Sequence, residues 1–201
     1  MTVRTAEHRR SVPRVMAALL MLALGCTGLW RPAAAAQEAG SFWVRSAHTV
    51  LSHEVYRLDA RIDFHLSTAA LDALHSGVPL TIDIHMQVIQ QRSWLWNRVV
   101  ADLHQYYRVQ YHALSDRYLV KNLNTGLVDS HHSLEDALDE IGIIHGFPML
   151  DERLLEPGAH YQGALQASLD IEALPTPMRV WAYVSSQWHL STDWYTWPLR
   201  K

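Results

Sequence analysis

The amino-acid sequence predicts a mainly β protein: an antiparallel β-sandwich domain with two short helices in its connections, behind an N-terminal signal helix. Three observations predict this arrangement. Apolar and polar residues alternate with a period of two over much of the chain after residue 55. Short connections rich in turn-forming residues separate these segments, which indicates antiparallel pairing. A basic, then apolar, then alanine-rich segment opens the chain.

The first 36 residues have the three parts of a secretory signal. Four arginines between positions 4 and 14 form a basic region, a run of ten apolar residues follows, and Ala34 and Ala36 precede the expected cut. The apolar run is shorter than the ~20 residues that a membrane-spanning helix needs. We therefore expect a signal peptide over 1–36 and a single exported, periplasmic domain over 37–201. An uncleaved membrane anchor and a lipid attached to Cys26 are the alternatives.

Charge and cysteine content narrow the classes of partner. Cleavage after Ala36 leaves 165 of the 201 residues, with a formal charge of −7. An acidic chain without a Lys/Arg cluster is not expected to bind nucleic acid, and we expect membrane contact only through the signal segment or a lipid on Cys26. Because Cys26 is the one cysteine, the mature domain has no disulfide and no thiol nucleophile, and its stability depends on its core.

Alternation identifies the strands, and capping residues identify the helices. Tyr56 to Phe64 and Val78 to Val88 alternate most clearly, each with one apolar and one polar face. Ser67 and Ser133 are expected to cap two short helices, which end near Leu74 and Ile141. The other expected strands cover residues 98–112, 116–122, 127–130, 143–147, 160–170, 179–184 and 187–191. An immunoglobulin-like or similar sandwich fits this series of short strands, and a β-barrel is the alternative.

The sequence lacks the common enzyme signatures. It contains no phosphate-binding glycine loop and no nucleophile elbow. His53-Glu54 begins a zinc-binding H-E-x-x-H pattern, but Arg57 occupies the place of the second histidine and cannot bind zinc. We therefore expect neither an enzyme nor a bound cofactor.

Histidine is the unusual residue, with twelve copies after position 36. Asp63-x-His65 and Asp83-x-His85 each place a carboxylate and an imidazole on one face of a strand. If those strands were neighbours in register, four ligands would converge on a metal such as zinc. The simpler interpretation is that polar residues occupy the solvent face of a sheet. A second hypothesis is that the histidines together change partner affinity in mild acid.

Aromatic residues gather in two places. Trp94 and Trp96 follow Arg92 in a connection between expected strands, where Trp and Arg are typical interface anchors. A second group lies near the C-terminus and comprises Trp181, Tyr183, Trp188, Trp194, Tyr195 and Trp197. Trp181 and Trp188 fall on expected strands, so we expect them in the core. We assign five residues to one interaction surface: Arg92, Trp94, Trp96, Trp194 and Trp197.

A series of short elements, taken in order, resembles a known family. They are Tyr56-x-Leu-x-Ala60, Phe64-x-Leu-Ser67, Gly77-Val-Pro-Leu80, Arg92-x-Trp94, Tyr111-His-Ala-Leu-Ser115 with Tyr118, Ala137-Leu138, Leu169-Asp170, Leu174-Pro175, and Trp188-x-Leu-Ser191 with Trp194. Together they are similar to the proteobacterial family called domain of unknown function forty-three ninety, over residues 42–199. The resemblance implies an exported protein, often encoded beside a nitrogen-regulation-type sensor histidine kinase and its response regulator. It supplies no catalytic residues.

These observations favour an interaction or sensing module that serves as an accessory to a membrane sensor histidine kinase. The alternative is a small-ligand or carbohydrate-binding β-sandwich that uses the aromatic groups. A metal-dependent hydrolase built on Asp63, His65, Asp83 and His85 ranks last, because recognisable site geometry is missing.

Overall fold

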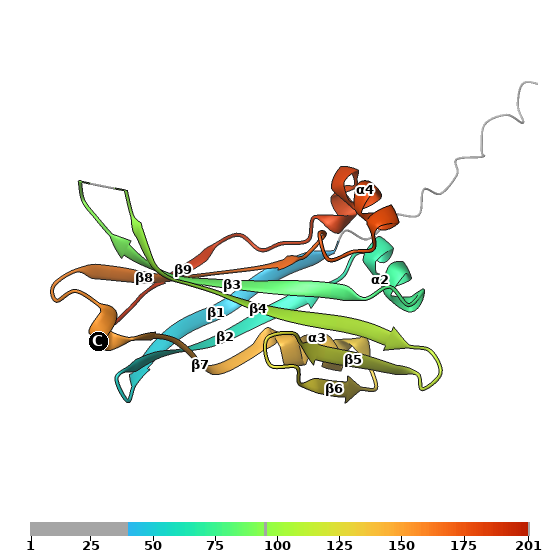
Figure 1. Ribbon diagram of the computed structural model, residues 1–201, viewed down its shortest axis with the longest axis horizontal. Coiled ribbons are helices and arrows are strands. Elements are labelled where there is room, and N and C mark those ends of the chain that lie inside the picture. Colours follow the sequence, from blue (N-terminus) through green and yellow to red (C-terminus); the bar gives the residue numbers. More distant parts are fainter. Residues whose placement is uncertain (1–39, 95, 201) are drawn as a thin grey trace, which may run out of the picture. The chain divides into compact units, whose positions relative to one another are not determined.

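Two antiparallel β-sheets share one hydrophobic core in the computed structural model, which describes residues 40–94 and 96–200 (Figure 1). A three-stranded sheet has the order β1 (Ser41–Ser52), β2 (Val55–His65) and β7 (Ile143–Asp151). A six-stranded sheet has the order β6 (Val128–His131), β5 (Arg117–Asn122), β4 (Arg98–His112), β3 (Leu80–Gln91), β8 (His160–Leu169) and β9 (Tyr195–Pro198). The mainly β, antiparallel fold class is confirmed. The expected signal peptide and Cys26 lie outside the described residues.

The core forms where the predicted alternation is strongest. Every second residue of β2 from Tyr56 to Phe64 is buried, and the same holds in β3 from Leu80 to Val88. Because successive side chains of a strand point to opposite faces, the intervening polar residues stay on the outside of each sheet. The two strands belong to different sheets, so each contributes one wall of the shared core.

Two of the three α-helices in the described part of the chain begin at the predicted serines. The Ser67 side chain accepts a hydrogen bond from the Ala70 backbone at the start of α2 (Thr68–His75), and Ser133 accepts one from Asp136 at the start of α3 (Leu134–Gly142). These bonds satisfy backbone N–H groups that have no partner within the helix. Gly142 ends α3 against β2, where a Cβ atom would lie 2.2 Å from the Ile62 carbonyl oxygen.

The third helix corrects the expected strand over residues 179–184. That segment belongs to α4 (Thr176–Val184), which has a proline in its first turn, a position where the missing N–H costs nothing. Trp181 is 73% exposed on α4, so its expected place in the core was wrong, whereas Trp188 is buried as expected. The expected strand over 187–191 is also wrong, because this part of the chain forms the 3₁₀ turn η2 (Ser186–Trp188) and a single bridge at Ser191. A second 3₁₀ turn, η1 (Glu152–Leu154), follows β7.

Strand β1 lies at the edge of the smaller sheet and was not predicted. A two-residue turn joins it to β2, and both turn residues, His53 and Glu54, have positive φ. Such turns usually contain Asn or Gly, and the absence of both residue types explains why no hairpin was predicted here. The Trp197 indole N–H of β9 donates to the Thr49 hydroxyl of β1 at 3.2 Å, which links the edges of the two sheets. Within the described residues, no helix is long and apolar enough to span a membrane.

Candidate functional site

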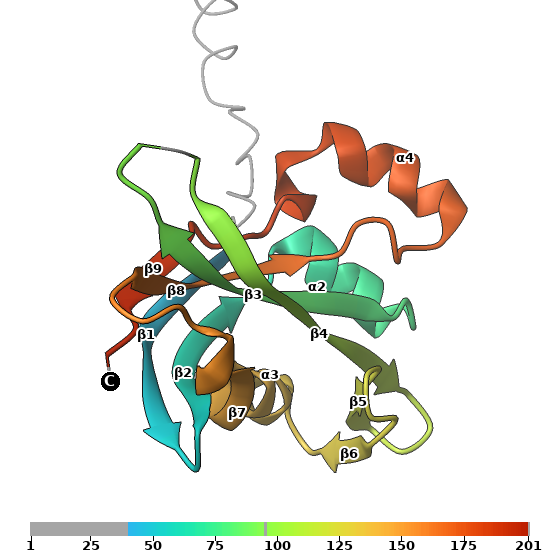
Figure 2. The same ribbon diagram turned by 60° about the vertical axis from the view of Figure 1, so that its left-hand side comes forward.

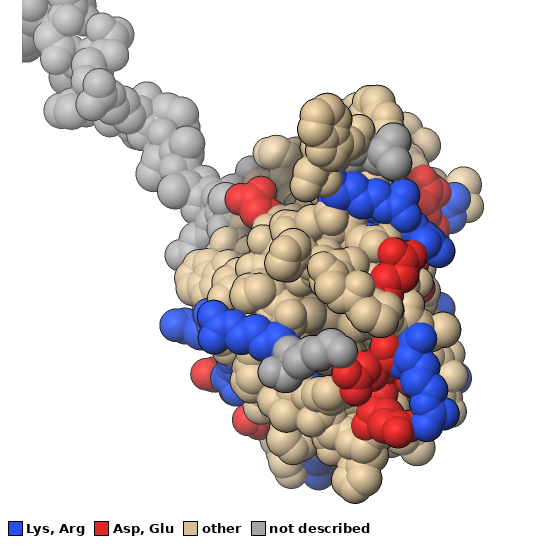
Figure 3. Space-filling view, turned by 90° about the vertical axis from the view of Figure 1, so that its left-hand side faces the viewer, with Lys and Arg blue, Asp and Glu red and all other residues tan. Residues whose placement is uncertain are grey.

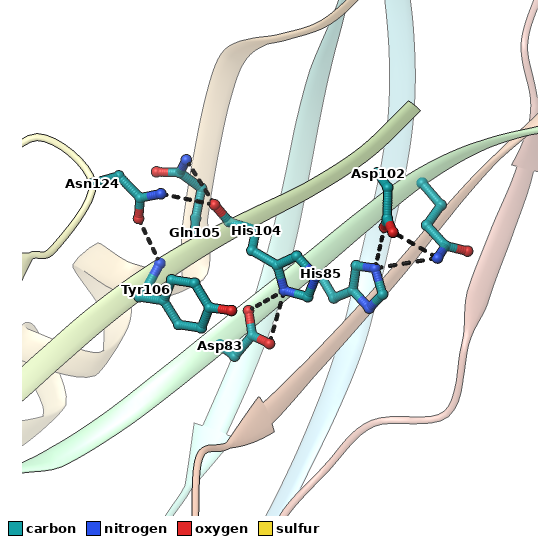
Figure 4. A network of polar contacts seen from close by, with 8 residues as sticks. Asp83, His85, Asp102, His104, Gln105, Tyr106 and Asn124 are labelled. Atoms are coloured by element: carbon teal, nitrogen blue, oxygen red, sulfur yellow. Dashed lines mark hydrogen bonds and ion pairs between the residues drawn. The ribbon is translucent and has the colours of Figure 1, made fainter. Parts of the chain in front are cut away.

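The strongest concentration of chemically active side chains lies on the outer face of β3 and β4. Asp83 and His85 alternate with fully buried residues of β3 and therefore point away from the core. The antiparallel register places His104 of β4 directly opposite His85. Asp102 lies two residues before His104 on the same face. The two strands thereby bring together two Asp-x-His motifs that run in opposite directions (Figure 4).

Each histidine in this cluster bonds to the aspartate of the other motif. The His85 Nε2 atom lies 2.5 Å from Asp102 Oδ1. His104 donates from Nδ1 to the two carboxylate oxygens of Asp83, at 2.9 and 3.0 Å. The two imidazole rings stack with their centroids 4.0 Å apart. We call Asp83, His85, Asp102 and His104 the histidine–aspartate cluster.

The electrostatics of the cluster favour an ionised carboxylate at Asp102. The hydrogen bond from His85, followed by one from the Gln87 amide at 3.2 Å, lowers the pKa of Asp102 below its usual value. Beside His104, loss of hydration raises the pKa of the Tyr106 hydroxyl, and the charge of Asp83 adds to this effect. The cluster thus combines a stable negative charge with two imidazoles.

Aromatic rings flank the cluster at both ends. The Tyr106 ring lies parallel to the His104 ring with a centroid distance of 5.6 Å. The Trp194 ring meets the His85 ring edge-on at 5.0 Å. The side chains of His85, His104 and Asp102 remain 22, 34 and 54% exposed, so that dissolved ions can reach them.

The hypothetical metal quartet, which ranked below a simple polar face, is not formed, because its two strands lie in different sheets. Asp63 and His65 belong to β2, whereas Asp83 and His85 belong to β3, whose neighbours are β4 and β8. Asp63 instead pairs with Arg45 and lies 3.9 Å from Arg61. Sequence reasoning therefore found half of the cluster and missed Asp102 and His104. The missed signal is a third Asp-x-His motif, Asp102-Leu-His104, on the next long strand.

The connection between β3 and β4 carries the exposed tryptophans. Figures 1 and 2 show this hairpin projecting away from the two sheets. Trp94 and Trp96 are 96 and 93% exposed. Arg92 donates to the Gln90 side chain from Nη2 at 3.1 Å, and Gln90 itself is buried. The hairpin therefore holds two indoles in solvent, with the neighbouring guanidinium fixed by a buried amide.

Trp194 and Trp197 do not extend this surface as expected. Trp194 lies 42% exposed beside the histidine–aspartate cluster. Trp197 is buried, because its ring covers Gly163 of β8, its partner in the register, where a Cβ atom would come within 2.3 Å of the ring. The five residues assigned to one interaction surface thus separate into the hairpin group, a residue at the cluster and a core residue.

An open groove of about 950 Å³ lies elsewhere, beside β1, β2, α2 and α3. Its lining includes Trp43, Arg45 and Arg61 and contains none of the tryptophans near positions 94–96 and 181–197. Arg61 and Asp139 pair at 3.2 Å in its wall. The groove is amphipathic, and the two arginines in its lining pair with Asp63 and Asp139.

Comparison with known proteins gave one match. The model of a family described as Domain of unknown function (DUF4390) matches residues 39–198. This match confirms the resemblance found in the sequence elements. No curated protein and no solved structure shows significant similarity to the chain.

Proposed function

The chain belongs to the DUF4390 family of domains of unknown function, and we propose that it is an exported interaction module that binds a membrane protein of the cell envelope. A sensor histidine kinase is the partner that we expect, from the gene neighbourhood that the resemblance implies. The docking element is the tip of the β3–β4 hairpin, which contains Arg92, Trp94 and Trp96.

The observation that carries this proposal is the nearly complete exposure of two indoles in one connection between strands. Trp94 and Trp96 leave a large apolar area in water, and tryptophan and arginine are enriched among the residues that dominate binding energy. Burial of such a side chain in a partner's pocket removes that area from water and stabilises the complex. The Gln90 contact holds Arg92 beside them, which reduces the entropy lost on binding.

Helix α4 offers a second exposed apolar surface on the same side of the molecule. Its solvent face carries Val180, Trp181, Tyr183 and Val184, which are between 52 and 77% exposed. In Figures 1 and 2 the hairpin and α4 both lie on the upper side of the sheets, and Figure 1 shows them toward opposite ends of the long axis. Figure 3 shows basic and acidic side chains interspersed over uncharged surface at the end of the molecule that carries the hairpin. These features support recognition by apolar contact rather than by a field of one sign.

The test is recovery of a sensor histidine kinase from solubilised membranes with the tagged protein as bait. We expect the wild-type protein to recover the kinase, identified by mass spectrometry. The double substitution Trp94→Ala/Trp96→Ala should reduce recovery by about tenfold or more, because truncation of a single hot-spot tryptophan costs about 2 kcal/mol or more.

Leu114→Ala is the matched control. Leu114 is 96% exposed in the turn between β4 and β5, so its substitution removes exposed apolar area without touching the hairpin tip. Recovery with this variant should equal that of wild type. The proposal is wrong if wild-type bait recovers only unrelated soluble proteins, or if the tryptophan double variant recovers the kinase as well as Leu114→Ala does.

A further inference from the structure

We propose that His85, Asp102 and His104 form a binding site for a divalent transition-metal ion of the zinc class. The potential ligand atoms of these three side chains all lie within 4.8 Å of one another, which is true of no other group of three among the residues that the structure describes. Two imidazoles and one carboxylate are the nitrogen and oxygen donors that Zn²⁺ accepts in open, three-ligand sites. The site is separate from the hairpin tip and does not depend on the function proposed above.

The second carboxylate of the cluster orients one ligand. Asp83 accepts the Nδ1 proton of His104 at 2.9 and 3.0 Å, which leaves Nε2 as the atom that can bind a metal. Histidine ligands of zinc commonly donate their other ring N–H to a carboxylate, and this contact fixes the tautomer and the direction of the ring. The structure therefore supplies an outer partner for His104 as well as the ligands themselves.

The other two ligands are already joined by a hydrogen-bonded proton where an ion would bind. The His85 Nε2 and Asp102 Oδ1 atoms are 2.5 Å apart, whereas two ligands of a tetrahedral zinc ion lie about 3.3 Å apart, given bonds of about 2.0 Å. Binding replaces the shared proton with the ion and releases that proton to solvent. The ligands need to separate only slightly, and the Gln87 amide remains within reach of Asp102.

The backbone beneath the site is rigid. Strand β3 lies inside the six-stranded sheet between β4 and β8, and its inward residues Ile84 and Met86 are fully buried. These anchors prevent a slip in register that would turn the ligands to the other face. Sites built on paired strands hold their ligands more closely than sites on loops.

Alternation alone does not account for the cluster. A solvent face requires polar residues, yet here two Asp-x-His motifs pair so that each histidine meets the aspartate of the other strand. Another Asp-x-His motif of the chain, Asp63-Phe-His65, provides an internal comparison. Asp63 pairs with arginines, and His65 lies against the Trp43 ring, at a centroid distance of 5.6 Å. The same sequence pattern thus forms a ligand group only where β3 and β4 pair.

The fourth coordination position would face solvent next to Trp194. Three protein ligands with one open position is the arrangement of zinc sites that bind water or an external group. The edge-on contact between Trp194 and His85 places an indole at the border of the site. A paramagnetic ion such as Cu²⁺ or Ni²⁺ bound here should therefore quench the fluorescence of Trp194.

The test is equilibrium dialysis of the EDTA-treated protein against Zn²⁺ at neutral pH, with bound metal measured by mass spectrometry. We expect one tightly bound ion per chain. His85→Ala and His104→Ala should each weaken that binding by at least tenfold. Asp83→Asn should weaken it by about 10- to 100-fold, the usual effect of losing an outer partner. Co²⁺ in place of Zn²⁺ should give the visible absorption of a tetrahedral site.

His145→Ala is the matched control, because His145 also pairs with an aspartate, Asp59, at 2.6 Å, but belongs to no group of three ligands within 4.8 Å among the described residues. This variant should bind zinc like wild type. Circular dichroism checks that every variant is folded. The site is disproved if wild type binds no zinc at micromolar concentrations. It is equally disproved if the double variant His85→Ala/His104→Ala retains the tight ion, since other histidines would then hold it.

Discussion

Near the end of β4, the acidity of a tyrosine depends on one neighbour in the turn that leads to β5. The Tyr111 hydroxyl donates a hydrogen bond of 2.8 Å to the Asp116 carboxylate. That bond, followed by loss of hydration, raises the pKa of Tyr111 above 10.0. The folded state therefore holds the phenolic proton more tightly than the unfolded chain does. Its contribution to stability is complete below pH 10 and is lost as the pH rises through the folded-state pKa.

Asp116→Asn should lower the pKa of Tyr111 toward 10. Asparagine keeps a hydrogen-bond acceptor and tolerates the positive φ of 50° at this position, but it removes the negative charge. Titration of tyrosine ¹³Cζ resonances by NMR measures the shift directly. Tyr107 is the control, because burial raises its pKa and Asp116 does not contribute. An unchanged Tyr111 pKa in Asp116→Asn would show that the carboxylate is not the cause.

Single residues also show why the cluster could be predicted only in part. The period of two places Asp83 and His85 on the solvent face, because the residues between them are apolar. The pattern carries no information about which strand lies alongside. Pairing with β4 depends on contacts across the whole sheet, and a shift by one residue would separate His85 from His104. The chemistry of the site therefore follows from register, which a single sequence does not specify.

At the scale of elements, the capping serines of the two predicted helices differ in their hydrogen-bond partners. Ser133 bonds to its own helix, through the Asp136 backbone and side chain. Ser67 is buried, and besides capping α2 it donates to the Gln187 carbonyl at 2.7 Å. Ser67 thus connects α2 to the segment around η2, which lies far away in the sequence.

Ser133→Ala should lower the free energy of unfolding by about 1 kcal/mol, the usual cost of a lost N-cap. Ser67→Ala should cost more, because it also leaves a carbonyl without its side-chain donor in a part-buried position. Urea denaturation of the two variants and wild type measures both values. Equal losses, or a larger loss for Ser133→Ala, would show that the contact with Gln187 contributes nothing.

The elements that the sequence did not reveal share one physical cause. Helix α4 contains Val180, Trp181 and Tyr183, residue types that favour strands. These apolar residues are exposed, so the sequence of α4 does not alternate between apolar buried and polar exposed positions with the period of a helix. Strand β1 has mixed burial along its length and ends in the His53-Glu54 turn. In both segments the pattern of apolar residues does not match the pattern of burial, whereas β2 and β3 were predictable because strong alternation agrees with their burial.

For the whole molecule, the decisive feature is that both sheets bury their inner faces in one core. Leu58 of β2 and Leu165 of β8 are fully buried in the same cluster of apolar side chains, although they come from different sheets. Neither sheet can keep its apolar face from water without the other. The domain should therefore unfold as one cooperative unit.

Leu58→Ala and Leu165→Ala should each lower the free energy of unfolding by about 2–5 kcal/mol, from lost burial and the cavity left behind. Leu114→Ala, at an exposed position, should change it by less than about 0.5 kcal/mol. Native-state hydrogen exchange then distinguishes a shared core from two independent ones. Either core substitution should reduce the protection of slowly exchanging amides in both sheets by the same free energy. If Leu58→Ala lowers protection in β2 and β7 while β3 and β8 keep theirs, the two sheets unfold separately and the shared core does not control stability.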